Sequence, residues 1–375
     1  MKTSPAERFS SPLWRDRALA ASAISGITRL AADAAAKTGG TVNFMEVCGT
    51  HTMAIAASGM RKLFPKELRM LSGPGCPVCV TSQGDIDRVL ALAAIPGVII
   101  TTFGDMLKVK GSKGLDLGSA RERGADIRVV YSPLDAVAMA QAEPSRQVVF
   151  IGVGFETTAP VIGGAVVRAK KLGLKNFSST AFFKLVPPAL ELLLSDPENK
   201  IHGFMLPGHV SAIIGTAPYK FVAEKYRVPC VVTGFEPMDI LSGISMLLKQ
   251  VISGKPLVED EYFRAVRAEG NPAAQKLMKE VFSVSAATWR AIGRVENTGL
   301  GFSKAYASFD AVKRFKIEYK EAPEPKGCLC GTILLGKALP PDCPLFGKAC
   351  TPSNAVGPCM VSSEGACAAW FKYGG

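Results

Sequence analysis

Short apolar runs alternate with segments of helical periodicity from residue 41 onward. The first three runs cover residues 41–47, 68–72 and 97–102, and each ends in a glycine-containing loop. Apolar positions repeat with the helical period after the first two loops, at residues 53–64 and 85–94. Strand, loop and helix in this order are typical of α/β units with parallel strands.

A second series of the same kind follows. Predicted strands at residues 147–153, 201–206 and 228–233 again end in glycine-containing loops, and helical segments are predicted at 159–173 and 219–226. The loops of the first series read CGTHT, GPGCPVC and FGD, and those of the second read GFETT, PGHVS and GFEP. Glycine after a strand is common by itself. The similarity of the two series therefore rests on the matched order in which glycine is combined with a polar or thiol side chain.

The two series predict the domain organisation. The second and third loops are similarly spaced, with 29 residues from Gly75 to Gly104 and 26 from Gly208 to Gly234. We therefore predict two related α/β domains with mainly parallel sheets, derived by duplication. They would span residues 1–142, including an N-terminal helical extension, and residues 143–256.

The rest of the chain has a different composition. A weaker helical pattern covers about residues 239–289, and the sequence becomes rich in proline, glycine and cysteine after residues 321–327. Residues 257–375 are thus predicted to form a helical segment and a small Cys-rich domain. Its apolar periodicity is too weak to build a core alone, so another kind of bond must hold it together.

The loops indicate where a site would lie. In open α/β sheets, binding sites form outside the carboxyl ends of the strands. If the two domains face each other, eight side chains could converge on one cleft: Cys48, His51, Cys76, Cys79, Asp105, Glu156, His209 and Glu236.

Composition narrows the class of protein. Hydrophobic residues make up 48% of the 375 residues and charged residues 20%, which allows a sizeable folded core. The net charge of +12 could suggest nucleic acid, but the basic residues are scattered and not interleaved with aromatics. An acidic partner protein or a solvated basic surface fits this pattern better, and no nucleic-acid partner is expected.

Neither a targeting segment nor a membrane span is predicted. The first 20 residues lack the apolar core of a signal peptide, and no apolar run approaches the roughly 20 residues that a span needs. We expect a cytoplasmic protein. In that compartment, ten cysteines are better interpreted as metal ligands or redox thiols than as structural disulfides.

Six of the ten cysteines lie in the last 48 residues: Cys328, Cys330, Cys343, Cys350, Cys359 and Cys367. Their spacings are wide and no histidine lies nearby, which favours an iron–sulfur cluster held by four thiolates over structural zinc. A zinc site and plain packing of small thiols remain alternatives. Spacing alone does not identify the four ligands.

Cys76 and Cys79 form a C-x-x-C pair after a glycine-rich turn that opens a predicted helix. Backbone N–H groups and the helix dipole favour a thiolate there, so the pair is interpreted as a redox-active dithiol. Half of a zinc site is the alternative. Cys230 lies in an apolar run and is predicted to be inert core.

Cys48 and His51 can be interpreted either as structural residues or as a functional pair. A cysteine at a strand end is often only a small buried residue. As a functional pair, the thiolate would suit low-valent iron, and the imidazole could bind a metal or take a proton. A Cys–His hydrolase is the rival chemistry.

Glu156 and Glu236 occupy equivalent loops and could form an acid/base pair or accept hydrogen bonds in the cleft, with His209 as a complement. A structural role, in which each accepts hydrogen bonds from a neighbouring loop, is the alternative. No phosphate-binding loop motif is present, so the motifs do not support nucleotide binding.

Taken together, CGTHT, GPGCPVC, GFETT, PGHVSAIIG, GFEP and the C-terminal cysteines resemble the HypD family of [NiFe]-hydrogenase maturation proteins. These motifs span residues 46–367. The family's cluster pattern, C-x₁₄-C-x₆-C-x₁₆-C, fits Cys328, Cys343, Cys350 and Cys367, and so implies that these four hold a [4Fe–4S] cluster. Cys330 and Cys359 are left over, and Cys359 could be a thiol beside the cluster.

The resemblance implies a role in building the Fe(CN)₂CO part of the hydrogenase active site. Such a protein works with a small HypC-type chaperone, receives cyanide from a HypE-type partner and serves the hydrogenase large subunit indirectly. The iron would be shared between a chaperone cysteine and Cys48, with His51 in the same motif, and Cys76 and Cys79 would relay electrons from the cluster. A stand-alone Fe–S-dependent disulfide oxidoreductase is the alternative function, and a zinc-stapled interaction protein is a third.

Overall fold

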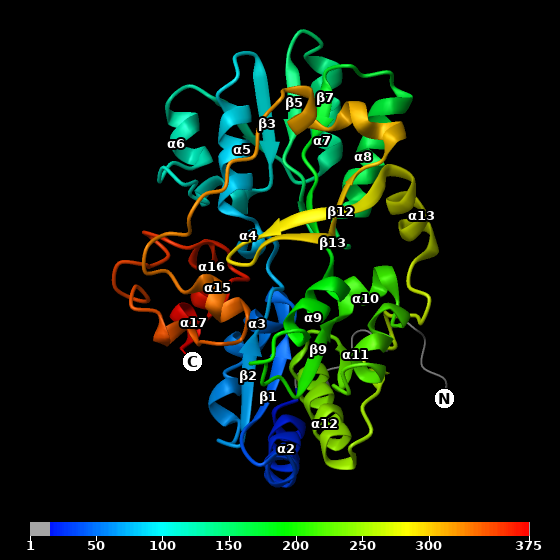
Figure 1. Cartoon of the computed structure of the whole chain (residues 1–375), viewed down its shortest axis with the longest axis vertical. Coiled ribbons are helices and arrows are strands. Elements are labelled where there is room, and N and C mark those ends of the chain that lie inside the picture. Colours follow the sequence, from blue (N-terminus) through cyan, green and yellow to red (C-terminus); the bar gives the residue numbers. More distant parts are fainter. Residues whose placement is uncertain (1–15, 375) are drawn as a thin grey trace.

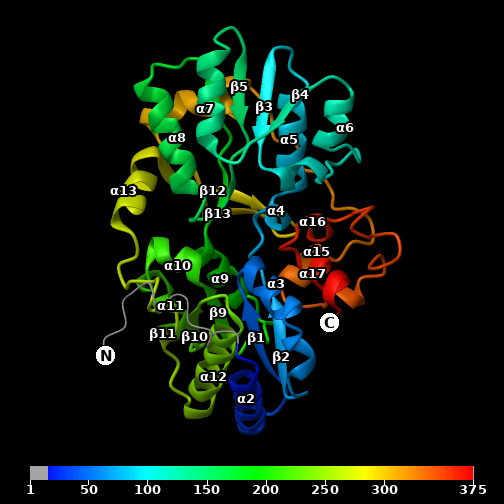
Figure 2. The same ribbon diagram turned by 180° about the vertical axis from the view of Figure 1, so that it is seen from behind.

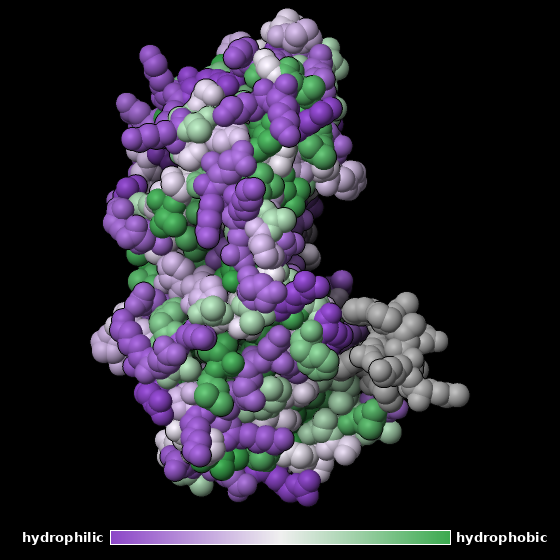
Figure 3. Space-filling model, turned by 90° about the vertical axis from the view of Figure 1, so that its right-hand side faces the viewer, coloured by the Kyte–Doolittle hydropathy of each residue, from purple (hydrophilic) through white to green (hydrophobic). Residues whose placement is uncertain are grey.

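A computed structural model describes residues 16–374 of the chain. Two lobes are stacked along the long axis, each built around a parallel sheet covered by helices (Figure 1). The Cys-rich segment lies against one side, next to α3 and α4, in both the front and the back view (Figure 2). On another side, the molecule narrows to a waist between the lobes (Figure 3).

The lower lobe holds a five-stranded sheet in the order β11-β10-β9-β1-β2, in which all neighbours are parallel. Its strands are β1 (Val42–Glu46), β2 (Leu68–Ser72), β9 (Gly203–Pro207), β10 (Cys230–Thr233) and β11 (Val258–Asp260). Helices α2 (Arg17–Thr38) and α12 (Pro237–Ser253) pack on it, and Ile27, Phe44 and Ile244 are fully buried in this core.

The upper lobe holds a four-stranded parallel sheet in the order β4-β3-β5-β7. Its strands are β3 (Val98–Thr102), β4 (Asp126–Val129), β5 (Gln147–Phe150) and β7 (Phe177–Ser179). The helices around it are α5 (Gln83–Ala93), α6 (Leu117–Glu122), α7 (Pro133–Ala142) and α8 (Ala159–Lys171).

Shorter elements complete the chain. The α-helices are α3 (Gly49–Ala57), α4 (Pro77–Val80), α9 (Val186–Leu194), α10 (Gly208–Ile214), α11 (Lys220–Glu224), α13 (Pro272–Val281), α14 (Ala311–Arg314), α15 (Cys330–Leu334), α16 (Pro358–Val361) and α17 (Ala366–Tyr373). The 3₁₀ turns are η2 (Met60–Leu63), η3 (Gly104–Lys108), η4 (Ala217–Tyr219), η5 (Lys304–Phe309) and η6 (Pro340–Asp342). Among the described residues, no helix combines the length and apolar character that a bilayer crossing needs.

The predicted fold class is confirmed, because the protein is mixed α/β with mainly parallel sheets and a cysteine-rich C-terminal segment. The boundary predicted at residue 142 differs from the division that the sheets make. The lower sheet joins β1 and β2, from before residue 142, to β9, β10 and β11, and the upper sheet likewise joins β3 and β4 to β5 and β7. Periodicity identifies a strand but not its neighbour, so the two sequence series do not correspond to two consecutive sheets.

The helical pattern predicted for about residues 239–289 is only partly present. Helices α12 and α13 lie in it, but β12 (Phe282–Trp289) and β13 (Gly293–Phe302) form an antiparallel hairpin. The hairpin joins β8 (Phe182–Lys184) and β6 (Val153–Gly154) in a small sheet that crosses the middle of the molecule (Figure 1). The wrong prediction came from weak periodicity, which cannot separate a half-buried strand from a helix.

The hairpin is fastened to the residues that follow the C-x-x-C pair. Arg290 is 2% exposed and donates to the Thr81 carbonyl at 2.9 Å and to Gln83 Oε1 at 2.8 Å. It also pairs with Glu324 of the segment leading to the Cys-rich region. One buried guanidinium therefore links three distant parts of the chain.

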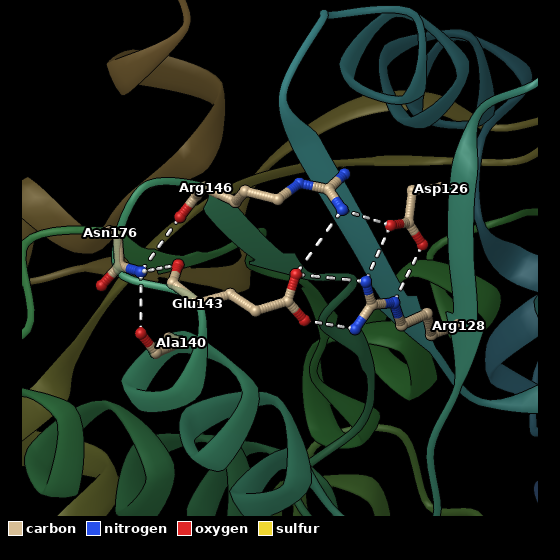
Figure 4. Close-up of polar contacts among 6 residues, drawn as sticks. All are labelled: Asp126, Arg128, Ala140, Glu143, Arg146 and Asn176. Atoms are coloured by element: carbon tan, nitrogen blue, oxygen red, sulfur yellow. Dashed lines mark hydrogen bonds and ion pairs between the residues drawn. The ribbon is translucent and has the colours of Figure 1, made fainter.

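The far end of the upper sheet is closed by charged and amide side chains (Figure 4). Arg128 and Arg146 both pair with Asp126, and both also contact Glu143. The buried Asn176 amide donates to three main-chain carbonyls around the end of α7, at 2.8, 3.1 and 3.0 Å. The contact with Ala140 satisfies a carbonyl that the end of α7 leaves without a helical partner, and the other two hold the turn between α7 and β5.

Candidate functional site

The carboxyl ends of the two sheets face each other in the middle of the molecule (Figure 1). The loops CGTHT, GPGCPVC, PGHVS and GFEP follow β1, β2, β9 and β10 of the lower sheet, which lie side by side. FGD follows β3, and GFETT lies beyond β5, in the upper lobe. Because adjacent parallel strands end at one edge, four of the six loops meet there.

Cys48 lies where these loops meet. It is the N-cap residue of α3 and only 2% exposed, and its Sγ lies 3.4 Å from Nε2 of His209, in the first turn of α10. The GPGCPVC loop packs directly on it, because a Cβ at Gly75 would lie 2.2 Å from the Cys48 backbone nitrogen. Glycine at this position therefore allows the loop after β2 to approach the thiol.

Burial determines the protonation of this pair. Desolvation raises the pKa of Cys48 to about 12, and the carboxylate of Glu364 acts in the same direction. The backbone N–H of His51 and the Thr50 side chain oppose this rise by favouring the thiolate. Burial also lowers the pKa of His209 to about 4. A thiol and a neutral imidazole therefore lie in contact at neutral pH.

His51 contacts a different loop. It is fully buried, and its Nε2 lies 2.9 Å from the Gly234 carbonyl and 3.0 Å from Thr233 Oγ1. Burial lowers its pKa to about 4, so the ring is neutral. His51 thus ties α3 to the loop after β10, and within the described residues Nδ1 of its ring has no hydrogen-bond partner.

Cys76 and Cys79 are joined by a disulfide bond at the start of α4. The bond lies between Cys48 and the Cys-rich segment: Gly75 packs on Cys48, and Cys79 Sγ is 3.9 Å from the carbonyl of Pro358. Pro358 directly precedes Cys359 in the sequence. This placement suits a redox relay between the two regions.

The six C-terminal cysteines are free thiols, and all but Cys328 are buried. Three of them approach one another: a Cβ at Gly357 would lie 2.6 Å from the sulfurs of both Cys328 and Cys330, and a hydrogen bond to Cys330 is the main cause of the raised pKa of Cys359. Burial and the neighbouring thiols Cys367 and Cys328 add to that rise.

This segment fits a four-thiolate iron–sulfur cluster in its donor set, since it supplies six buried or half-buried thiols and no competing histidine. Within residues 16–374, no group of three or more His, Cys, Asp or Glu side chains has an arrangement that could hold a metal ion. Cys343 approaches the Gly327 carbonyl at 3.8 Å, and the Val356 N–H points at Cys350 Sγ at 3.4 Å. The choice of Cys328, Cys343, Cys350 and Cys367 as ligands therefore rests on the family pattern.

Glu156 and Glu236 take separate contacts. Glu156 is 3% exposed, accepts the N–H of Val186 at 2.9 Å and has its pKa raised to about 7 by burial. It lines a mainly apolar cavity of about 460 Å³ between α9, α10 and α13. Glu236 is the N-cap residue of α12 and forms a capping box with Asp239. These contacts are the ones expected if both glutamates have a structural role and do not act as an acid/base pair.

Asp105 and Glu364 line a smaller cavity of about 250 Å³ beside Pro77 and Val78 of the C-x-x-C turn. Asp105 is exposed, whereas Glu364 accepts the Thr50 hydroxyl at 2.9 Å and packs on Gly49. Glu364 was missed by the motif analysis, although it lies between Cys359 and Cys367. Phe235 was also missed, although it lies inside GFEP; it contacts both His51 and His209.

Comparison with known proteins gives consistent matches over nearly the whole chain. The family model described as "HypD: Hydrogenase formation hypA family" matches residues 22–374. Proteins named "Hydrogenase maturation factor HypD" are similar to it. That of Cupriavidus necator is 45% identical over 91% of this chain and 92% of its own length. That of Rhizobium leguminosarum is 45% identical over 96% and 94%. The Escherichia coli protein is 44% identical over 88% and 89%.

Proposed function

The chain belongs to the HypD family of hydrogenase formation proteins, and from that premise we propose that it holds an iron atom at Cys48 while cyanide and CO are added to it. The iron is cargo. It would arrive and leave with a small HypC-type chaperone that contributes a second thiolate, and a HypE-type partner would deliver cyanide. The completed Fe(CN)₂CO unit would then reach the hydrogenase large subunit.

The observation that carries the proposal is the Cys48–His209 contact at 3.4 Å, beside the Cys76–Cys79 disulfide. A thiolate is a soft ligand that suits low-valent iron. When iron binds, the Cys48 S–H bond breaks, the Fe–S bond forms and the proton is passed on by way of His209 to solvent, since the low pKa of that ring does not retain it. His51 supports this arrangement by fixing α3 against the loop after β10.

Electron supply is the second part of the proposal. A [4Fe–4S] cluster held by Cys328, Cys343, Cys350 and Cys367 would supply single electrons at low potential. Reduction of the Cys76–Cys79 disulfide takes two electrons and two protons and yields two thiols. The contact of Cys79 with Pro358 and the grouping of Cys359 with Cys330 support a thiol route from the Cys-rich segment to this disulfide.

The runner-up is a stand-alone disulfide oxidoreductase, which the buried disulfide next to free thiols favours. The two functions differ in their need for Cys48. An oxidoreductase would work through Cys76 and Cys79 without it, whereas an iron scaffold would not.

The test compares Cys48→Ala with wild type and with the matched control Cys230→Ala, which removes a fully buried thiol from β10. Each protein is purified anaerobically with the chaperone, and its iron content, visible spectrum and dithiol content are measured. We expect Cys48→Ala to keep the cluster spectrum and the dithiol but to lose the iron atom bound in addition to the cluster. Iron retained in Cys48→Ala would contradict the proposal.

We place this activity in the cytoplasm, where free thiols persist. The basic surface expected from a net charge of +12 suits an acidic partner protein.

A further inference from the structure

The loop after β10 holds both histidines of the site. Thr233 Oγ1 and the Gly234 carbonyl contact Nε2 of His51, as described above. The next residue, Phe235, stacks on the His209 ring with centroids 5.0 Å apart and planes 19° apart. The same phenyl ring lies 4.7 Å from the His51 ring, with the planes tilted by 31°. One aromatic side chain therefore contacts two imidazoles.

The phenyl ring is itself held in place. Tyr262 meets it edge-on, with centroids 6.0 Å apart and planes 75° apart. Tyr262 also packs against two glycines of the site loops, since a Cβ at Gly208 or at Gly234 would lie 2.6 Å from its ring. Neither glycine could carry a side chain without moving Tyr262.

Buried carboxyl groups fix the backbone on either side of Phe235. Glu261 accepts the Gly234 N–H at 3.3 Å, and Asp239 accepts the N–H of Glu236 at 3.2 Å. Asp239 is fully buried and pairs with Arg264. The loop is thus a rigid support, and Phe235 is the part of it that reaches His209.

His209 needs such a support more than His51 does. Within residues 16–374, the Cys48 thiol is the only hydrogen-bonding partner of the His209 ring. The χ2 torsion of histidine is broad, so a single contact leaves the ring plane free to turn. Stacking on a fixed phenyl ring removes that freedom and keeps Nε2 directed at Cys48 Sγ.

We propose that Phe235 is a positioning residue for the Cys48 site, which orients the His209 imidazole toward the thiol and steadies His51. Its role in iron capture rests on the proposed function, but its effect on His209 and on the reactivity of Cys48 does not. A positioned base accelerates proton transfer by about 10²- to 10⁴-fold. If the His209 ring loses its orientation, part of this rate enhancement should be lost.

The first measurement is NMR of iron-free protein with labelled histidine. The chain has three histidines, so each ring is observed, and His202 serves as an internal control because it contacts Asn43 instead of Phe235. In Phe235→Leu we expect the His209 and His51 ring signals to lose their aromatic ring-current shift while His202 is unmoved. Phe235→Tyr keeps the ring and should keep the shifts. Unchanged His209 signals in Phe235→Leu would overturn the proposal.

The second measurement is a double-mutant cycle on the rate at which iodoacetamide alkylates Cys48, followed by peptide mass spectrometry. We expect Phe235→Leu to slow the reaction about three- to tenfold, Phe235→Tyr to restore it, and Phe235→Leu to have no further effect in a His209→Ala background. Additive effects, or a faster reaction in Phe235→Leu, would show that Phe235 only packs or shields, and would overturn the proposal. If the Leu variant does not fold, Phe235→Met, of similar volume, takes its place.

The third measurement is Fe(II) binding by the same variants with the chaperone present. Weaker Fe(II) binding in Phe235→Leu than in Phe235→Tyr would show that the positioning of His209 also contributes to iron binding. If wild type binds no iron while the NMR and alkylation results hold, the proposed function fails and the positioning role of Phe235 stands.

Discussion

Burial leaves the Cys48 thiol and the rings of His51 and His209 uncharged at neutral pH. The thiol of Cys48 has a pKa of about 12, and the rings of His51 and His209 have pKa values of about 4. The uncharged forms of these three side chains avoid the cost of desolvating an ion. In the proposed function, iron would supply the positive charge that stabilises the thiolate, so its capture should release a proton.

Glu156 should make the stability of the protein depend on pH. Burial raises its pKa from 4.5 to about 7, so it favours the folded state below pH 4.5, and this contribution is lost as the pH rises through 7. At 1.36 kcal/mol per pKa unit, wild type should lose about 2 to 3 kcal/mol of unfolding free energy from this group between pH 5 and pH 8. Glu156→Gln should remove that loss, as measured by urea unfolding at both pH values.

The control for this experiment is Glu224→Gln, which changes an exposed glutamate of α11 and should leave the pH dependence as it is in wild type. Equal pH profiles for Glu156→Gln and wild type would mean that Glu156 does not titrate between pH 5 and pH 8.

The elements of this protein were predictable to different degrees. Strands β1, β2, β3, β5, β9 and β10 lie where the apolar runs predicted them, because each is a buried run closed by a glycine loop. The hairpin of β12 and β13 was not predicted, since residues such as Ser283 and Val284 are exposed and give no clean alternation. Sheet neighbours could not be predicted either, because pairing is decided by contacts between residues far apart in sequence.

Asn176 should stabilise the end of helix α7. Its buried amide donates to the carbonyls of Ala140, Glu143 and Arg146 (Figure 4). Removing the amide leaves the buried Ala140 carbonyl without its partner and takes a hydrogen bond from two half-buried carbonyls, so Asn176→Ala should lower the unfolding free energy by about 2 kcal/mol. Chemical denaturation followed by circular dichroism measures this change.

A matched control is Asn354→Ala, which removes an exposed amide that donates to the Ala349 carbonyl. It should shift the unfolding midpoint much less. A similar shift in both variants would show that the contacts of Asn176 add no particular stability.

At the scale of the whole molecule, the site belongs to no single continuous segment. Cys48 follows β1, His209 follows β9, and Phe235 follows β10, while Glu364 comes from the Cys-rich region. The chain therefore passes between the lobes several times before the site is complete. The motifs predicted candidate residues in these loops, but the contacts of Phe235 and Glu364 depend on this long-range closure and could not be predicted.

The interleaved sheets predict the behaviour of a fragment. Residues 1–142 contain β1 and β2 without β9, so the lower sheet would lose its centre and expose apolar strand edges. We expect this fragment to show no cooperative unfolding transition and poor dispersion in its NMR spectrum, in contrast to the full chain. A cooperatively folded fragment would restore the boundary predicted at residue 142.

In the proposed function, Cys48 holds the iron on which the diatomic ligands are assembled. Infrared spectroscopy of the anaerobically purified complex with the chaperone tests it most directly, because cyanide and CO bound to iron have their own stretching bands. Wild type and Cys230→Ala should show both sets of bands, whereas Cys48→Ala should show neither while its iron–sulfur absorption persists. CN and CO bands in Cys48→Ala, or their absence from wild type under conditions that support maturation, would contradict the account.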